Sequence, residues 1–145
     1  MAFSRSANLG SGTGYSVKTK GGKELQEKLG KLAALQLLKP AMDDATLGLV
    51  RDLKQYPTQS STTGYRRTNL LKRGWTAQTT IGKRHIEGIV GNNVKYAPYV
   101  QDTKEQSAIH RRNWKQHTIQ YIAKKRSRHI ADQFNGEISR IWRSK

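Results

Sequence analysis

The chain has 145 residues, with 27 Lys and Arg against 10 Asp and Glu, so its formal net charge at pH 7 is +17. This length indicates one domain, and the absence of cysteine excludes disulfide scaffolds, thiolate metal sites and cysteine nucleophiles. Apolar runs are far shorter than the roughly 20 residues of a membrane span, and no apolar secretory signal opens the chain, which predicts a soluble protein without a membrane partner.

The positive charge is concentrated in three parts of the chain. The net charge is +4 over residues 1–23, 0 over 24–63, +6 over 64–84, −1 over 85–102 and +8 over 103–145. Six basic residues and no acid lie between Gly64 and Arg84, and seven basic residues and no acid lie between Arg111 and Arg128. Such charge favours an acidic partner, which is nucleic acid, an anionic surface or an assembly with negative subunits.

Residues 1–22 are rich in glycine, serine and threonine and have few large apolar side chains. This composition predicts a flexible or partner-ordered arm that precedes a single domain at residues 23–145. The Gly-Ser-Gly-Thr-Gly stretch at residues 10–14 lacks the Gly-Lys-Ser/Thr ending and the flanking strand and helix of a phosphate-binding loop. We therefore expect no nucleotide cofactor.

A helical period of leucines runs from Lys23 to about Tyr56. Pro40 interrupts it, because proline lacks an N–H donor and clashes with the preceding turn. The pattern predicts either one long kinked helix or two helices that meet at Lys39–Pro40. Tyr56–Pro57 ends the helix, and residues 58–64 have the composition of a loop.

The period then changes to two. Residues 75–81 alternate between apolar and polar side chains, which predicts a half-buried strand. Gly82-Lys83-Arg84 is a plausible turn, and residues 85–91 form the returning strand of a hairpin. Asn92–Asn93 can adopt left-handed geometry and end this strand, and residues 107–114 are a candidate third strand.

The remaining chain predicts one short segment and one long helix. Residues 94–100 are aromatic-rich, and Pro98 biases Ala97 toward extended geometry. From about Thr118 the apolar residues cover an arc of roughly 160° on a helix, and Arg126 falls within that arc, where it must snorkel or find a partner. The order helix, hairpin, helix predicts an α+β fold with both helices on one face of a small antiparallel sheet.

Catalysis has little support in the residues. The ten acids are scattered, and pairs such as Asp43/Asp44 lie among lysines of a helix. His110, Asn113 and His117 could share a helix face, but they lack a carboxylate partner and the spacing of known zinc or nuclease motifs. We expect no enzyme, no metal site and no cofactor.

Binding is better supported, because basic residues are interleaved with aromatic residues in Tyr65-Arg66-Arg67 and Arg111-Arg112-Asn113-Trp114. These segments could hold phosphates while their rings stack on bases. Equally, the three tryptophans could be core or interface anchors beside a solvated charged face. No helix-turn-helix, KH or RNP-type signature is visible, so nucleic-acid binding would be independent of sequence.

The order of segments resembles a known family. Gly21–Leu29 reads GGKELQEKL, Thr63–Leu70 reads TGYRRTNL, and Val90–Gln101 reads VGNNVKYAPYVQ. This succession is similar to the neck or tail-completion (minor tail component) proteins of long-tailed bacteriophages over residues 20–102. The family often has an acid and Gly-Thr after Tyr-Val, where this chain has Gln101-Asp102-Thr103, and commonly has Leu at the position of Tyr65.

The resemblance implies a structural virion protein that forms a ring oligomer at the head–tail junction, around the channel for DNA. Its partners would be further copies of itself, neighbouring connector and tail proteins, and genomic DNA; its place would be the virion, after assembly in the host cytoplasm. The alternative is a sequence-nonspecific nucleic-acid-binding protein. The Tyr-Ala-Pro-Tyr element could instead serve local packing against the hairpin.

Two groups of site residues follow from this hypothesis. The subunit or partner interface comprises Tyr65, Arg66, Arg67, Lys72, Arg73, Tyr96, Pro98 and Tyr99. The basic residues proposed to lie near DNA are Arg111, Arg112, Lys115, Lys124, Lys125 and Arg128.

Overall fold

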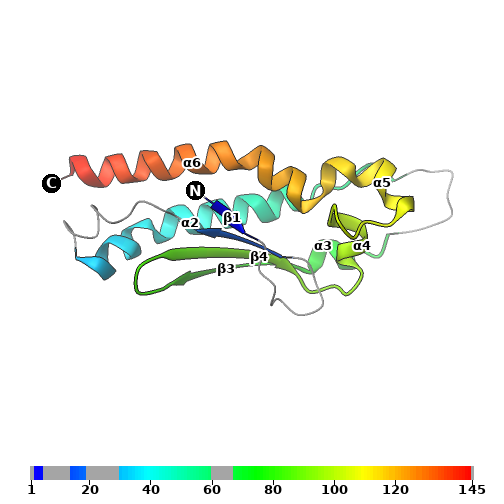
Figure 1. Ribbon diagram of the computed structural model, residues 1–145, viewed down its shortest axis with the longest axis horizontal. Helices are drawn as coiled ribbons and strands as arrows, with labels where there is room; N and C mark the ends of the chain where they lie inside the picture. The colour runs from blue at the N-terminus through cyan, green and yellow to red at the C-terminus, as the bar shows by residue number, and fades with distance from the viewer. Residues whose placement is uncertain (1, 5–13, 19–29, 60–66, 145) are drawn as a thin grey trace.

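The computed structural model in Figure 1 describes residues 2–4, 14–18, 30–59 and 67–144. Its elements in chain order are β1 (Ala2–Ser4), β2 (Gly14–Lys18), α2 (Lys31–Leu53), α3 (Leu70–Arg73), β3 (Trp75–Ile81), β4 (Ile86–Asn92), α4 (Ala97–Gln101), α5 (Ala108–Trp114), the 3-10 helix η1 (Lys115–His117) and α6 (Ile119–Arg143). Long helices lie along one side of an antiparallel sheet, which confirms the α+β class.

The predicted hairpin is present. β3 and β4 pair antiparallel with Ile81 opposite Ile86, and the four residues between them form the connection at one end of the molecule. Alternate residues of β3 are exposed, as a half-buried strand requires. Asn92 does end β4, but neither Asn92 nor Asn93 has a positive φ; among the described residues other than glycine, only Asn69 has one, at 58°.

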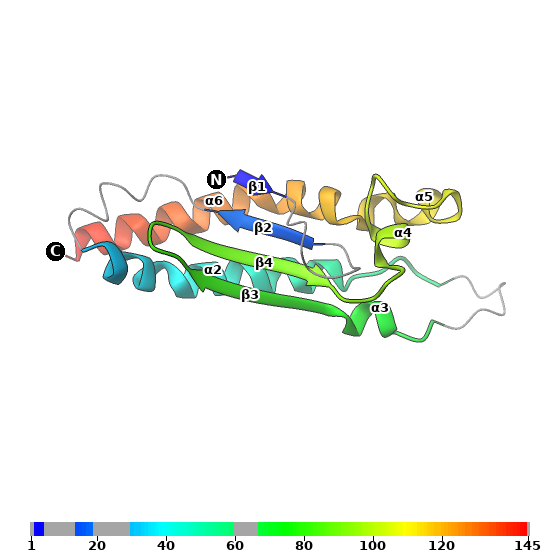
Figure 2. The same cartoon turned by 60° about the horizontal axis from the view of Figure 1, so that its bottom comes forward.

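The segment predicted as an arm contributes strands to this sheet. β2 pairs antiparallel with β4, with Val17 opposite Gly88, and β1 pairs with β2, so the strand order is β1-β2-β4-β3 (Figure 2). Residues 14–18 therefore depart from the expectation of an arm, because the free edge of β4 supplies the hydrogen-bond partners that the segment itself lacks. Residues 2–4 depart from it in the same way, and residues 1, 5–13 and 19–22 lie outside the described residues.

The first long helix, α2, is continuous across Pro40 and ends at Leu53. Pro40 is exposed, so the missing N–H of its ring falls on the solvent side of the helix. The helix begins at Lys31 in the structure, and the predicted start at residues 23–29 lies outside the described residues.

The C-terminal helix is confirmed. α6 begins after Thr118, whose hydroxyl accepts a hydrogen bond from the N–H of Tyr121, and it continues through Asn135–Gly136 to Arg143. Arg126 finds a partner in Asp52 of α2, with which it forms an ion pair. Within the described part of the chain, no helix has the length and apolar character needed to cross a membrane.

The core lies between α2, α6 and the sheet. α2 packs directly on β3 and β4, and α6 packs along α2 (Figures 1 and 2). One cluster joins Met42 of α2 to Ile86 of β4 and to Ile130 and Phe134 of α6. A second cluster includes Leu49 and Leu53, Trp75 and Val90, and Ile119 and Ile122.

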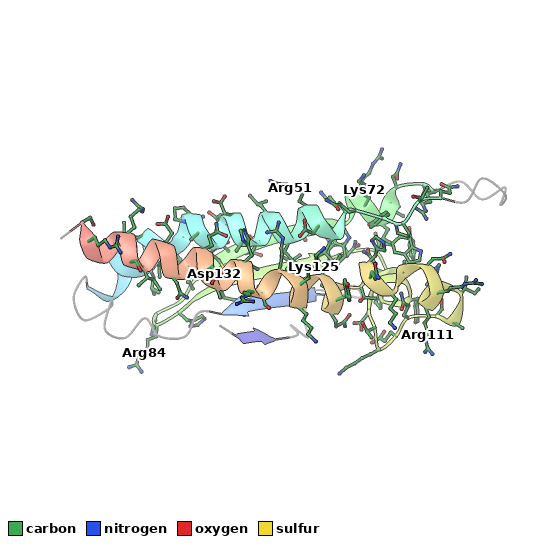
Figure 3. All side chains as sticks on the ribbon, turned by 90° about the horizontal axis from the view of Figure 1, so that it is seen from above. Arg51, Lys72, Arg84, Arg111, Lys125 and Asp132 are labelled. Atoms are coloured by element: carbon green, nitrogen blue, oxygen red, sulfur yellow. The ribbon has the colours of Figure 1, made fainter. Side chains whose placement is uncertain are left out.

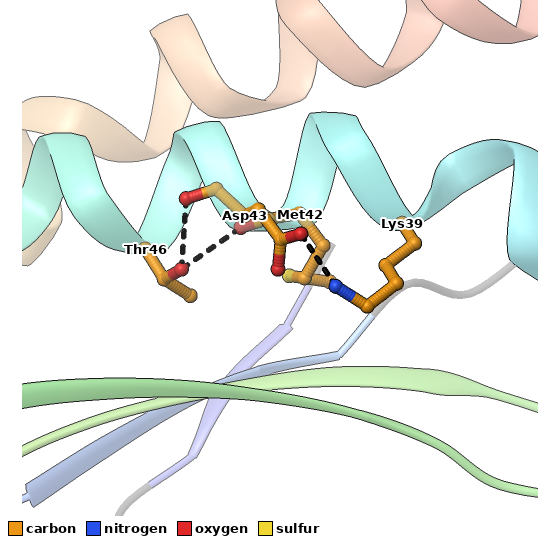
Figure 4. A network of polar contacts seen from close by, with 4 residues as sticks. All are labelled: Lys39, Met42, Asp43 and Thr46. Atoms are coloured by element: carbon orange, nitrogen blue, oxygen red, sulfur yellow. Dashed lines mark hydrogen bonds and ion pairs between the residues drawn. The ribbon is translucent and has the colours of Figure 1, made fainter.

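Helix α2 approaches the sheet closely at Gly88. A Cβ atom at Gly88 would lie 2.3 Å from Cγ2 of Thr46 and 2.7 Å from Sδ of Met42, so only glycine allows this approach. Thr46 shares its hydroxyl proton between the carbonyl oxygens of Met42 and Asp43, each 3.0 Å away (Figure 4). Partial burial acts to raise the pKa of Asp43, but the ammonium of Lys39, 2.6 Å away, holds that pKa below its usual value.

Two sequence predictions near the far end of β4 are wrong. Residues 108–114 form the helix α5 and not a third strand. Trp114 is the single buried side chain of this segment, so burial does not alternate along it as it would along a strand. Ala97 begins the helix α4 and is not extended. Pro98 takes the second position of α4, where its missing N–H would have no helical partner in any case.

Candidate interaction surface at the aromatic end

The short helices α3, α4, α5 and η1 gather at one end of the elongated molecule, which we call the aromatic end (Figure 1). A pocket of about 410 Å³ opens there between α3, α4, α5 and the segments that flank residues 60–66. Its lining is mostly apolar and contains no acid: Tyr56, Thr58, Gln59, Arg67, Thr68, Asn69, Leu70, Leu71, Tyr96, Val100, Ile109, His110, Asn113 and Trp114.

Trp114 is the centre of an aromatic cluster in the wall of this pocket. Its ring centroid lies 4.9 Å from that of Tyr56, and the guanidinium of Arg67 lies 5.3 Å from the Trp114 ring, within the range of a cation–π contact. His110 and His117 meet the same ring edge-on at 6.2 and 6.1 Å. The pocket wall is therefore an aromatic cluster with a fixed cation against it.

Arg67 is also held by its main-chain surroundings. Its Nη1 donates a hydrogen bond of 2.5 Å to the carbonyl oxygen of Pro57. This bond uses one of the five N–H donors of the guanidinium, and the structure gives Arg67 no acidic partner among the described residues. A carboxylate brought to the pocket by another chain would meet a preplaced cation.

The hydroxyl of Tyr56 is buried and makes no hydrogen bond with the described part of the chain. The nearby indole N–H of Trp75 is instead donated to Oε1 of Gln101, at 3.2 Å. Burial raises the pKa of Tyr56 to about 12, because the charged phenolate would lose its hydration there. The ring of Tyr56 thus serves as an apolar wall, and its hydroxyl is a net cost to the folded state.

Large apolar side chains surround the pocket and remain exposed. The exposed fractions are 53% for Leu70, 41% for Tyr96 and 85% for Ile109, and Tyr99 on α4 is 56% exposed. Contiguous exposed apolar residues beside a hollow are typical of a protein interaction site. The aromatic end therefore has the form of a docking surface for another protein.

Buried polar side chains hold this end together. Gln101 is completely buried; its Nε2 donates to the carbonyl oxygens of Leu53 and His117, at 3.2 and 3.0 Å, and its Oε1 accepts the indole N–H of Trp75. This one side chain joins the end of α2, the start of β3 and η1. A carboxylate at the same position could accept the indole N–H but could not donate to either carbonyl.

Asn92 performs a similar role at the end of β4. Its Nδ2 donates to the carbonyl oxygen of Leu71, at 2.7 Å, and its Oδ1 accepts the N–H of Val94, at 3.0 Å. A Cβ atom at Gly74 would lie 2.4 Å from this Oδ1, so the chain must have glycine there. These contacts fix α3 against the hairpin and set the position of Leu70 and Leu71 at the pocket.

The predicted interface residues are only partly brought together. Tyr65 and Arg66 lie outside the described residues. Arg67 and Tyr96 line the pocket, Tyr99 is exposed on α4, and Lys72 and Arg73 are exposed on α3. The prediction that Pro98 contacts another subunit is wrong. Its side chain is buried within its own chain at the second position of α4 and is not available to a neighbour.

The two basic segments behave differently. The block from Gly64 to Arg84 is divided, because β3 carries the chain from Lys72 at the aromatic end to Arg84 at the opposite end (Figure 3). The six residues proposed to lie near DNA are all exposed on α5, η1 and α6, and the structure gives them no acidic partner among the described residues: Arg111, Arg112, Lys115, Lys124, Lys125 and Arg128.

The histidines considered for a metal site have other contacts. Nδ1 of His117 lies 2.7 Å from the carbonyl oxygen of Gln55, and His110 meets Trp114 on the pocket wall. Among the described residues, no three His, Asp or Glu side chains are grouped so that they could hold a metal ion.

Sequence reasoning did not identify the pocket itself. The sequence pattern marks Tyr56 only as a helix end and Trp114 only as a candidate anchor, and it gives no signal for Leu70 or Ile109. Comparison of the chain with protein-family models, curated proteins and solved structures gives no significant match. The arrangement thus defines an α+β protein with an exposed, mostly apolar pocket that has one cation, Arg67, in its wall.

Proposed function

We propose that this chain is a structural virion protein of a tailed phage, which forms an oligomeric ring at the head–tail junction around the DNA channel. The observation that carries the proposal is the exposed apolar pocket at the aromatic end, which is suited to protein contact. The resemblance of residues 20–102 to phage neck or tail-completion proteins is the reason for proposing this kind of assembly. In this role the chain is not an enzyme and uses no cofactor.

The aromatic end is the surface that would meet a neighbouring connector or tail protein. Leu70, Tyr96 and Ile109 offer apolar contact, and Arg67 offers a cation to an acidic residue of that neighbour. Aromatic and arginine side chains in such a setting commonly contribute most of the binding energy of an interface.

The second group of residues gives this ring a surface for DNA. Three basic residues of α5 and η1 and three of α6 follow one another along the molecule and have no acidic partner among the described residues. Exposed lysines and arginines of this kind bind phosphate without regard to base sequence. A DNA-lined channel needs contact of this nonspecific type.

The same exposed basic residues also support the alternative, a sequence-nonspecific nucleic-acid-binding protein that acts alone. Light scattering with and without duplex DNA separates the two functions. A ring protein is oligomeric without DNA, because contacts between its subunits dominate. A chain that stays monomeric and binds duplex DNA with a steep salt dependence would establish the alternative and exclude the ring.

The proposed role at the head–tail junction is tested with Ile109→Asp in the phage that encodes the chain. Ile109 is 85% exposed, so the substitution leaves folding unchanged, but it places an unpaired carboxylate in the docking surface and weakens the contact by about 2 kcal/mol or more. Electron microscopy of lysates should then show filled heads and tails that have not joined.

The matched control is Leu47→Asp, because Leu47 is 56% exposed on α2 and lies outside the pocket. This variant should give normal virions. Normal virions from Ile109→Asp as well would remove the docking role of the aromatic end.

A further inference from the structure

The far edge of the sheet is formed by β3, beside which no further strand pairs among the described residues. The N–H of Gly82 donates to the carbonyl oxygen of His85, and the N–H of Asn93 donates to that of Gly74, at 2.9 and 3.1 Å. Bonded pairs alternate along an antiparallel ladder, so the even-numbered residues of β3 bond to β4. The main-chain N–H and C=O groups of four residues therefore point away from β4: Trp75, Ala77, Thr79 and Ile81.

This edge lacks the features that usually protect a free strand. Proteins shield such edges with charged side chains, proline, bulges or very short strands. β3 has seven residues, WTAQTTI, and none is charged, proline or glycine, although 26% of the whole chain is charged. Thr76, Gln78 and Thr80 are exposed along it. An unprotected row of donors and acceptors is a template for another strand.

We propose that β3 pairs with β1 of a second copy of this chain, so that neighbouring copies continue one antiparallel sheet. The inference rests on the proposed function in that it describes the contact between ring subunits. It differs from the docking surface, because the aromatic end meets another protein and the sheet edge meets another copy.

Charge favours this contact between identical chains. Each copy carries +17, so a contact between two copies is least opposed where the meeting segments themselves carry no charge. β1, Ala2–Ser4, has no charged residue, and neither has β3. Strand pairing between them brings no like charges face to face within the paired segment.

Strand direction favours β1 as the partner. Four antiparallel strands leave the two edges, β1 and β3, running in opposite directions. A neighbour in the same orientation therefore presents its β1 antiparallel to β3, and repetition of this head-to-tail contact closes a ring by rotation. Pairing of β3 with a second β3 would stop at a dimer and would set Lys72 and Arg73 against Lys83 at the other end of the partner's strand.

The chain has no cysteine, which allows a direct crosslinking test. Ser4 and Gln78 lie in one row of Cα partners that runs through Ser16 and Ile89. The full chain with Ser4→Cys and Gln78→Cys is oxidised mildly and separated without reductant. The same test is made with Ser4→Cys and a cysteine two positions along β3 in either direction, at Thr76 or Thr80.

At least one double variant should give a ladder of linked copies beyond the dimer, and Gln78→Cys alone should give no more than background. Dimers from Gln78→Cys alone, in a yield equal to that of the double variants, would show that β3 meets β3 and would overturn the proposal. The absence of crosslinks from all double variants, or a chain that sedimentation shows to be monomeric at every concentration, would overturn it as well.

A second measurement uses charge at the edge. Gln78→Lys places a cation on the exposed side of β3 and should reduce the oligomer to monomers in sedimentation, whereas the uncharged control Gln78→Thr should leave it intact. An unchanged oligomer in Gln78→Lys refutes the strand contact and leaves the proposed function standing. If Gln78→Lys dissociates the oligomer while Ile109→Asp gives normal virions, the docking role of the aromatic end is refuted and the strand contact is retained.

Discussion

The body of the molecule and its aromatic end are stabilised by different means. In the body, large apolar side chains such as Met42, Leu49 and Ile130 are fully buried between the long helices and the strands β3 and β4. At the aromatic end, the apolar cluster is small, and three buried polar side chains, Asn92, Gln101 and Gln106, donate hydrogen bonds to main-chain carbonyl oxygens. Because these hydrogen bonds hold the aromatic end together, apolar side chains there can remain on the surface.

This difference bears on function. A segment whose framework is held by hydrogen bonds to main-chain atoms can expose large apolar side chains without losing its shape. Leu70, Tyr96 and Ile109 are exposed on a framework that Gln101 and Asn92 fix in place. The aromatic end is thus a preformed surface, and the docking that we propose there would need little ordering of the main chain.

The largest expected effect tests the body. Ile130→Ala removes a fully buried side chain between α2 and α6 and should lower the free energy of unfolding by about 4 kcal/mol, because the surrounding helices cannot close the cavity. Urea denaturation measures this loss. A loss below about 1 kcal/mol would contradict the importance that we give to apolar packing in this region.

An intermediate effect tests the aromatic end. Gln101→Leu leaves the Trp75 indole N–H and the carbonyl groups of Leu53 and His117 without partners, and should cost about 3 kcal/mol. Hydrogen exchange should accelerate in α4 and α5 and remain slow in the middle of α6. Uniform acceleration over the whole chain would remove the distinction between the two regions.

The smallest effect concerns Tyr56 and has the opposite sign. Tyr56→Phe removes a buried hydroxyl that has no partner among the described residues and should raise the free energy of unfolding by about 1 kcal/mol at pH 7. The pKa of Tyr56 is about 12 in the folded chain against 10.0 for an ordinary tyrosine, so wild-type stability falls as pH rises from 10 to 12. Phenylalanine lacks this contribution.

The difference between the two chains should therefore grow over this pH range, as measured by urea denaturation at each pH. Parallel stability curves for Tyr56→Phe and the wild type would show that the hydroxyl is solvated. Its burial in the wall of the pocket would then be contradicted.

The sequence predicted the hairpin and α6 because their burial is periodic. Residues 75–81 alternate with a period of two, and α6 shows one wide apolar stripe. It did not predict α5, since only Trp114 of that helix is buried and one buried residue defines no period. β2 was also missed, because its partner β4 lies about 70 residues away and glycine dominates its surroundings.

The candidate site was predicted only in part for a related reason. Arg67 and Tyr96 were chosen from local patterns, and both line the pocket. The wall itself needs Tyr56, which follows α2, and Trp114 at the end of α5, which are 58 positions apart and meet only through the fold. No short-range pattern records such a meeting, and the role of Gln101 in arranging it is equally invisible along the chain.

The strand order has a consequence for the timing of folding. β1 and β2 are synthesised before β4, yet β2 joins the sheet only through β4, so the N-terminal strands cannot become part of the sheet until β4 has left the ribosome. The hairpin and α2 form from contacts nearer in the chain. If β1 is the edge that meets the next copy, that edge exists only after the rest of the sheet, and a nascent chain cannot join its neighbours before it has folded.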